Sequence, residues 1–231
     1  NFFKYLTSQI HLLETNPAQM LEAPKIKQSL PKHLTLEDSL ELISSVDGPY
    51  KERDYCILVL FLNCGMRLSE LCSINLTDIY SDGTLRLLGK GNKERMVYLN
   101  DACKDAINAY LAVRPNDNLK VGDRNALFIS RNSKRISNKT VQYIVKKYLD
   151  KAGLSGQGLS THKLRHTAAT LMYQHGDVDI RVLKDILGHA NLGTTQIYTH
   201  ISNSQIKNAI DSNPLSQVKM RNKNQEKKGD T

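Results

Sequence analysis

The sequence has no tryptophan and only four phenylalanines. Together with its ten tyrosines, aromatic residues make up 6% of the 231 residues. This scarcity argues against a surface that binds single-stranded nucleic acid by stacking bases on aromatic rings. None of the four cysteines forms a CxxC pair, and three lie in or beside apolar stretches. We therefore expect reduced thiols in the core of a cytosolic protein, not disulfides or zinc ligands.

Long hydrophobic runs are missing as well. The longest one, from Tyr55 to Cys64 with one asparagine inside, is too short to cross a bilayer. No charged and then apolar leader opens the sequence. Because Asn1 is not a natural start, we expect an excised fragment, and the missing leader carries little weight.

Positive charge is in excess. The 32 Lys and Arg against 23 Asp and Glu give a formal net charge of +9. A surplus of this size suggests a polyanionic partner, and nucleic acid is the first candidate. A basic surface that only keeps the protein soluble is the alternative.

The chain divides by composition. Residues 1–14 have apolar positions at helical spacing, and Asn16-Pro17 ends that helix. Residues 23–32 hold two prolines and several lysines, as an extended basic linker does. We predict a remnant of the last helix of an upstream domain at 1–22, a linker at 23–34, a complete domain at 35–213 and a charged, disordered tail at 214–231.

The predicted fold of the complete domain is mainly α with a small antiparallel sheet (α+β). Thr35 caps a first helix, and residues 53–64, apolar almost all round, form a buried helix that Gly65 ends before Ser69 caps a short one. Strands at 84–88 and 95–99 flank a turn rich in glycine and lysine. Further helices are predicted at 101–112, 138–151, 161–175, 179–187, 194–200 and 203–212.

The segment from Thr161 to His166 brings cations to a helix N-terminus. With Thr161 as the cap, His162 and Arg165 lie side by side where backbone N–H groups also favour an anion, so a phosphate fits there. Scattered polar groups on a surface helix are the alternative. A zinc pair of His162 and His166 is disfavoured, because no glutamate stands between them and Arg165 adds a positive charge.

Three other residues are ambiguous when taken singly. His189 follows a helix-ending glycine and can be a C-cap contact, while Tyr198 in a short helix can be a packing residue. Arg67, behind the buried helix, has to find an anion, which is either a ligand phosphate or a protein carboxylate such as Glu70.

Five segments in one order resolve the ambiguity. They are GMRLSEL at 65–71, GKGNKER at 89–95, HKLRH at 162–166, LGH at 187–189 and TQIYTH at 195–200. Together they resemble the tyrosine recombinases, the phage integrase family, and most of all its bacterial XerC/XerD branch, over residues 1–212. Met66, where leucine is common, is a small departure.

The resemblance implies a tyrosine-recombinase catalytic domain at 35–213 and a core-binding domain upstream of it. It also implies an active site of six residues. Two arginines hold the scissile phosphate, a hairpin lysine is mobile, two histidines assist, and a tyrosine is the nucleophile: Arg67, Arg165, Lys90, His162, His189 and Tyr198.

The implied chemistry needs neither metal nor ATP nor another cofactor. The arginine guanidinium groups neutralise the non-bridging phosphate oxygens. Tyr198 forms a 3′-phosphotyrosine, and His162 accepts the proton of the Tyr198 phenol. Lys90, with Lys93 as its rival, protonates the departing 5′-hydroxyl. We expect site-specific recombination, in chromosome dimer resolution or in integration and excision of a mobile element. A type IB topoisomerase-like enzyme and a catalytically silent DNA-binding regulator are the alternatives.

The expected partner is double-stranded DNA, in the cytoplasm of a bacterium and at its nucleoid, with no membrane contact. In the family four protomers act together, so we expect a homotetramer, or a heterotetramer with a related recombinase. The apolar stripe of Ile206, Ala209 and Ile210 suits a C-terminal helix that is exchanged between neighbours. Packing of this stripe on its own domain is the alternative.

Overall fold

The computed structural model describes residues 2–21, 33–89, 94–175, Val182, Leu187 and 203–220, with side chains at 203–206 outside the description. The chain divides into two compact units, Asn1–Pro31 and Lys32–Thr231, and each is described by itself.

The first unit holds one short helix, α1 (Phe2–Ser8), and the prediction of a helix as far as residue 14 is wrong. The hydroxyls of Thr7 and Ser8 donate to the carbonyls of Phe3 and Lys4, and such bonds compete with continued helix formation. The backbone then turns at His11, whose φ is 50°.

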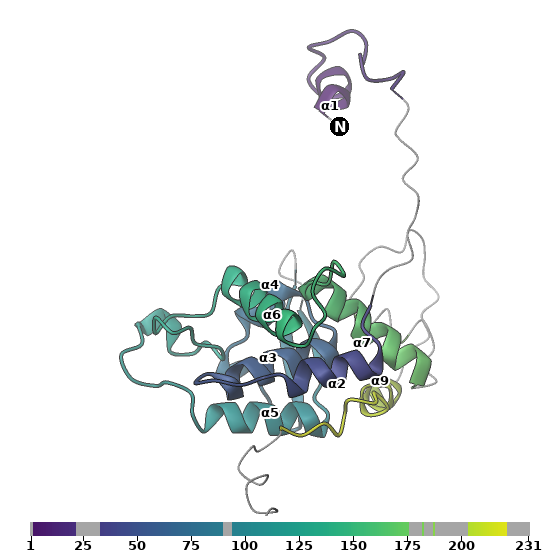
Figure 1. The fold of residues 1–231 in the computed structure, drawn as a ribbon. Coiled ribbons are helices and arrows are strands. Elements are labelled where there is room, and N and C mark those ends of the chain that lie inside the picture. Colours follow the sequence, from purple (N-terminus) through teal and green to yellow (C-terminus); the bar gives the residue numbers. More distant parts are fainter. Residues whose placement is uncertain are drawn as a thin grey trace, which may run out of the picture. The chain divides into compact units, whose positions relative to one another are not determined.

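The second unit is built around α3 (Lys51–Cys64), which is buried along most of its length. Its apolar residues face neighbours on every side, as a central helix requires. Figure 1 shows α5 below α3 and α7 to one side of it. The helices packed against α3 are α2 (Leu36–Ser44), α5 (Asp101–Leu111), α6 (Asn138–Lys151) and α7 (Thr161–His175).

A two-stranded antiparallel sheet pairs β1 (Thr84–Leu88) with β2 (Glu94–Tyr98). Residues 90–93 of the turn, Lys90 and Lys93 among them, lie outside the described residues. The short helix α4 (Leu68–Ser73) packs on β1 and on α6, and two 3₁₀ turns cover Leu76–Asp78 and Val121–Asp123. The prediction of a mainly α fold with a small antiparallel sheet is confirmed.

Local side-chain signals account for some of the helix starts. Thr35 caps α2, since its hydroxyl accepts from the N–H of Asp38. The prediction that Ser69 caps α4 is wrong. The helix starts after Arg67, whose N–H donates to the carboxylate of Glu70. Thr161 is already the first helical residue of α7, not its cap.

The C-terminal helix α9 (Asn203–Asp211) and the residues after it pack on their own domain. Leu215 is fully buried, Asn213 donates to the carbonyl of Leu62, and the N–H of Ala102 donates to Ser216. Residues 214–216, which belong to the predicted disordered tail, are therefore docked on the domain, and Val218 and Met220 also pack against the core. The predicted helices at 179–187 and 194–200 lie outside the described residues, apart from the buried Val182 and Leu187.

All four cysteines are free and buried, as predicted. Burial raises the pKa of the Cys72 thiol to about 11, although Arg135 acts in the opposite direction. Among the described helices, none combines the length and the apolar character that crossing a bilayer requires.

Candidate active site

The site begins where α3 ends. Gly65 closes the helix in the left-handed conformation, at φ 56°, which costs glycine little. A Cβ there would lie 2.8 Å from Cδ2 of Leu187, so a larger residue would also make that side chain shift. The turn delivers Arg67 to the start of α4.

Glu70 is a buried carboxylate with two arginine partners. Its Oε1 accepts from Nη1 of Arg67 at 2.8 Å and from Nη1 of Arg95 at 2.5 Å. Its Oε2 accepts from the N–H of Arg67 at 2.7 Å. Burial alone would raise the pKa of Glu70, but the hydrogen bond and charge of Arg95, and then the bonds from Arg67, outweigh it and lower the pKa.

Arg165 reaches the same region from α7. It is 5% exposed, and its Nη1 donates to the carbonyl of Gly65 at 2.7 Å, while Nη2 donates to the carbonyl of Leu187. Desolvation lowers its pKa to about 10, and the positive charges of Arg67 and Arg95 contribute in the same direction.

Arg165 therefore remains charged at neutral pH, in a place where other cations disfavour its charge. We call Arg67, Arg95, Arg165 and Glu70 the arginine cluster. Its three positive charges and one negative charge leave a net +2. An anion such as a phosphate would relieve the repulsion among them.

His162 lies on α7, three residues before Arg165, and is exposed. Its Nε2 is 3.0 Å from Nε2 of His166, and the two rings meet edge to face. One imidazole therefore donates to the other, so His166 restrains the orientation of His162.

Of the six predicted site residues, three lie among the described ones. The structure brings Arg67 and Arg165 together and places His162 on the helix of Arg165. The other three, Lys90, His189 and Tyr198, lie outside the described residues. The sequence prediction did not include Arg95. Its only signal was its place in the GKGNKER segment, because its partner Glu70 is 25 positions away.

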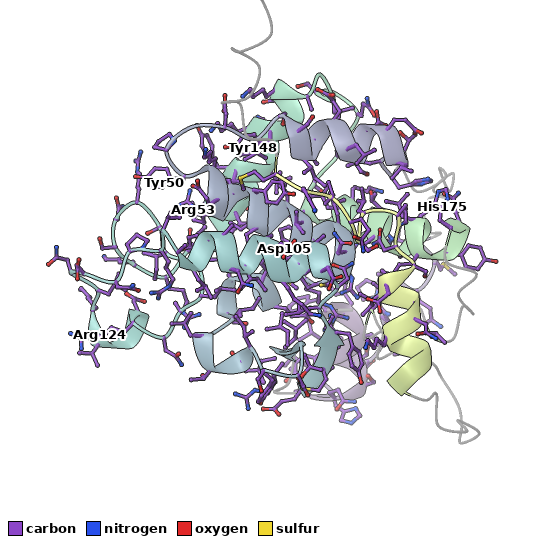
Figure 2. The ribbon with its side chains drawn as sticks, turned by 90° about the horizontal axis from the view of Figure 1, so that it is seen from below. Tyr50, Arg53, Asp105, Arg124, Tyr148 and His175 are labelled. Carbon is purple, nitrogen blue, oxygen red and sulfur yellow. The ribbon has the colours of Figure 1, made fainter. Side chains whose placement is uncertain are left out.

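A basic groove of about 710 Å³ lies beside α6. Figure 2 shows Tyr50 and Arg53 near Tyr148, on the opposite side of the domain from His175 at the end of α7. One carboxylate, Asp54, lines the groove. Six cationic side chains line it as well: Arg53, Arg131, Lys134, Arg135, Lys139 and Lys147.

The groove is connected to the helix that carries Glu70. Nη1 of Arg135 donates to the carbonyls of Cys72 and Ile74, at 3.2 and 3.1 Å, where α4 ends. The surplus of positive charge makes the groove suitable for an extended polyanion.

Comparisons with known proteins agree with the sequence resemblance. Residues 32–205 match the model of the phage integrase family. The chain is 56% identical over 217 residues to tyrosine recombinase XerC of Caldanaerobacter subterraneus subsp. tengcongensis, covering 94% of this chain and 61% of that protein. The chain thus spans less than two thirds of this relative's length.

Two solved structures share the fold. The crystal structure of XerA recombinase has a TM-score of 0.63 and 27% identity, covering 89% of this chain and 78% of that one. The structure of XerH site-specific recombinase, bound to its difH substrate in a pre-cleavage complex, has a TM-score of 0.61 and 26% identity. The match covers 70% of this chain and 48% of that one. The arginine cluster, the fold and the match over residues 32–205 together show that this chain belongs to the phage integrase family, the tyrosine recombinases.

Proposed function

We propose that this chain is the catalytic part of a site-specific DNA recombinase that cleaves and rejoins strands through a covalent 3′-phosphotyrosine. The observation that carries the proposal is the convergence of Arg67 and Arg165, from separate segments, in a cluster of net positive charge. The relatives carry recombinase names, which favours recombination over the topoisomerase-like and silent-regulator alternatives.

The two arginines would act on the scissile phosphate. Attack on a phosphodiester concentrates negative charge on its non-bridging oxygens, and fixed guanidinium groups stabilise that charge without reorganising. Removal of one well-placed donor of this kind typically slows a reaction on the order of 100- to 1000-fold. Arg165 suits the role, because carbonyls on both of its terminal nitrogens already hold it in place.

The remaining roles come from the resemblance. Tyr198 would attack the phosphorus, His162 would accept the phenol proton and Lys90 would protonate the 5′-oxygen as it leaves, with His189 as a further donor. The contact between His162 and His166 supports the assignment to His162, since a proton acceptor works best when its ring is held in one orientation.

Double-stranded DNA would lie along the basic groove and reach the arginine cluster over α4. XerH, in the structure similar to this one, is bound to its DNA substrate. The exposed cations of the groove, Arg131, Lys134, Lys139 and Lys147, would contact phosphates and give an affinity that falls steeply with salt. The role would be chromosome dimer resolution or mobile-element movement, at the nucleoid in the cytoplasm of a bacterium.

Assembly into a homotetramer, or a heterotetramer with a related recombinase, is part of the proposal. In the single chain Ala209 and Ile210 of α9 are buried on their own domain, and Asn100 donates to the carbonyl of Ile210. We expect the same contacts to receive α9 of a neighbour when four protomers meet on DNA.

A nicked suicide duplex tests the activity, because loss of a short fragment traps the covalent intermediate. The chain, joined to an upstream core-binding domain, should form an adduct that resists denaturant, and Tyr198→Phe should abolish it. Tyr173→Phe, an exposed tyrosine on α7, is the matched control and should leave the adduct unchanged. A wild-type protein that forms no adduct would refute the proposed function.

A further inference from the structure

Arg95, on β2, is a charged group buried with few hydrogen bonds. Its side chain is 16% exposed, and its Nη1 donates to Oε1 of Glu70. Its other two nitrogens, Nε and Nη2, are buried and have no hydrogen-bond partner in the described part of the chain. Buried donors without partners are unfavourable, so burial of this arginine calls for an explanation.

Arg114 shows how the same domain buries an arginine for structural purposes. Its Nε donates to the carbonyl of Leu127 at 3.0 Å, and Nη2 donates to Ala126 at 2.6 Å. Its Nη1 donates to the side chain of Asn116 at 2.6 Å. All three nitrogens of Arg114 are satisfied. Arg95 bonds through one nitrogen to the residues that the structure describes, and that partner is a carboxylate.

The charge of Arg95 changes the balance around Glu70. Without Arg95 the negative charge of Glu70 would cancel that of Arg67, and the arginine cluster would carry +1. With Arg95 the cluster carries +2. This second charge matches the additional negative charge that a phosphodiester gains on attack.

We propose that Arg95 is a positioning residue of the active site, whose charge offsets Glu70 so that Glu70 can hold Arg67 without neutralising it. The inference rests on the proposed function and goes beyond the six residues that the family resemblance supplies. Its geometric basis is the single oxygen, Oε1 of Glu70, that both arginines share.

The charge of Arg95 also reaches Arg165. After desolvation and Arg67, Arg95 is the next contributor to the lowered pKa of Arg165. The three guanidinium groups therefore form one electrostatic unit, although they lie on α4, β2 and α7.

A purely mechanical role is the competing explanation, in which the ion pair only ties β2 to α4. The two explanations predict opposite behaviour for Glu70→Gln. If Arg95 supplies charge, Arg95→Gln weakens anion binding and Glu70→Gln does not, because it raises the net charge. If the ion pair only holds β2 against α4, Arg95→Gln and Glu70→Gln weaken anion binding equally, because each variant breaks the ion pair.

Binding of inorganic phosphate to the full chain tests this without DNA. At constant ionic strength, Arg95→Gln should raise the phosphate Kd roughly tenfold. The double variant Arg95→Gln with Glu70→Gln restores +2 and should bind like the wild type. Arg86→Gln, on the partner strand and outside the cluster, is the matched control and should change nothing. Equal losses in Arg95→Gln and Glu70→Gln would overturn the inference.

Arg95→Lys decides the same question should the Glu70 variants not fold. Lysine keeps the charge but loses the planar fork, so charge compensation expects most of the phosphate affinity to remain. A loss as large as that of Arg95→Gln, with unchanged thermal unfolding, would overturn the inference.

Covalent adduct formation on the suicide duplex links the inference to the reaction. Arg95→Gln should slow it about 10- to 100-fold, while Arg95→Lys stays within several-fold of the wild type. Wild-type rates in Arg95→Gln would overturn the inference and leave the proposed function standing. A wild-type chain without an adduct refutes the function, and phosphate binding still decides the role of Arg95.

Discussion

Glu70 organises the candidate site at the scale of single residues. One carboxylate caps α4 through the N–H of Arg67, orients the guanidinium of the same residue and binds Arg95. A buried carboxylate is costly unless it is paired and hydrogen-bonded, and Glu70 is both. One side chain therefore contacts both of the arginines that approach from α4 and β2.

The lowered pKa of Glu70 predicts a particular dependence of stability on pH. The pKa lies below its ordinary value of 4.5 in the folded chain, so Glu70 contributes stability above that pH and loses it as pH falls through the folded value. In urea unfolding, the wild type should lose more free energy of unfolding between pH 5 and pH 3 than Glu70→Gln does. Parallel curves for the two proteins would contradict this linkage.

Residue-level prediction succeeded only in part. The pairing of Arg67 with Arg165 came from the family resemblance, because no spacing rule relates residues so far apart. Arg95 could not be found this way, since its contact with Glu70 depends on the strand register that sets Leu87 opposite Arg95. The sequence analysis considered Glu70 as a partner of Arg67, and the structure adds the second arginine.

At the scale of elements, strong patterns were reliable and weak ones were not. The all-round apolar run correctly predicted α3, and the helix predicted at 138–151 matches α6. The helix predicted over residues 1–14 ends at Ser8, where the hydroxyls of Thr7 and Ser8 donate back to main-chain carbonyls. The start of α4 was missed, since a distant charge network rather than a serine hydroxyl sets it.

Docking of the C-terminal segment gives an element-scale prediction. Asn213 is buried, donates to the carbonyl of Leu62 and accepts from the N–H of Leu215. Asn213→Ala leaves both backbone groups without their partner and should lower the free energy of unfolding by about 1–3 kcal/mol. Chemical denaturation measures this, with the exposed Gln217→Ala as the control. Equal stability of both variants would show that the segment is not docked this way.

At the scale of the whole molecule, the net charge of +9 indicated a polyanionic partner, but not where it binds. The basic groove gathers Arg53 of α3, Arg131 of a loop and Lys139 of α6. Only the packed fold brings these segments together, so a local sequence pattern could not predict the groove.

The groove predicts a change in the salt dependence of DNA binding. Lys139→Ala should weaken binding to all sequences and reduce the slope of log K against log salt by about 1. Fluorescence anisotropy over a range of NaCl concentrations measures this slope. Lys104→Ala, an exposed lysine on α5 outside the groove, is the charge-matched control. A slope that changes equally in both variants would place the DNA elsewhere.

The anchoring of Arg165 has a consequence for sequence drift. Both of its partners, at Gly65 and Leu187, are main-chain carbonyls. Every amino acid carries such a carbonyl, so replacement of nearby side chains leaves these anchors in place as long as the backbone path is kept. Mutation of neighbouring side chains therefore affects the position of Arg165 little. The hold on Arg67 instead includes a side-chain acceptor, Oε1 of Glu70, and is weakened when that position carries a residue without such an acceptor.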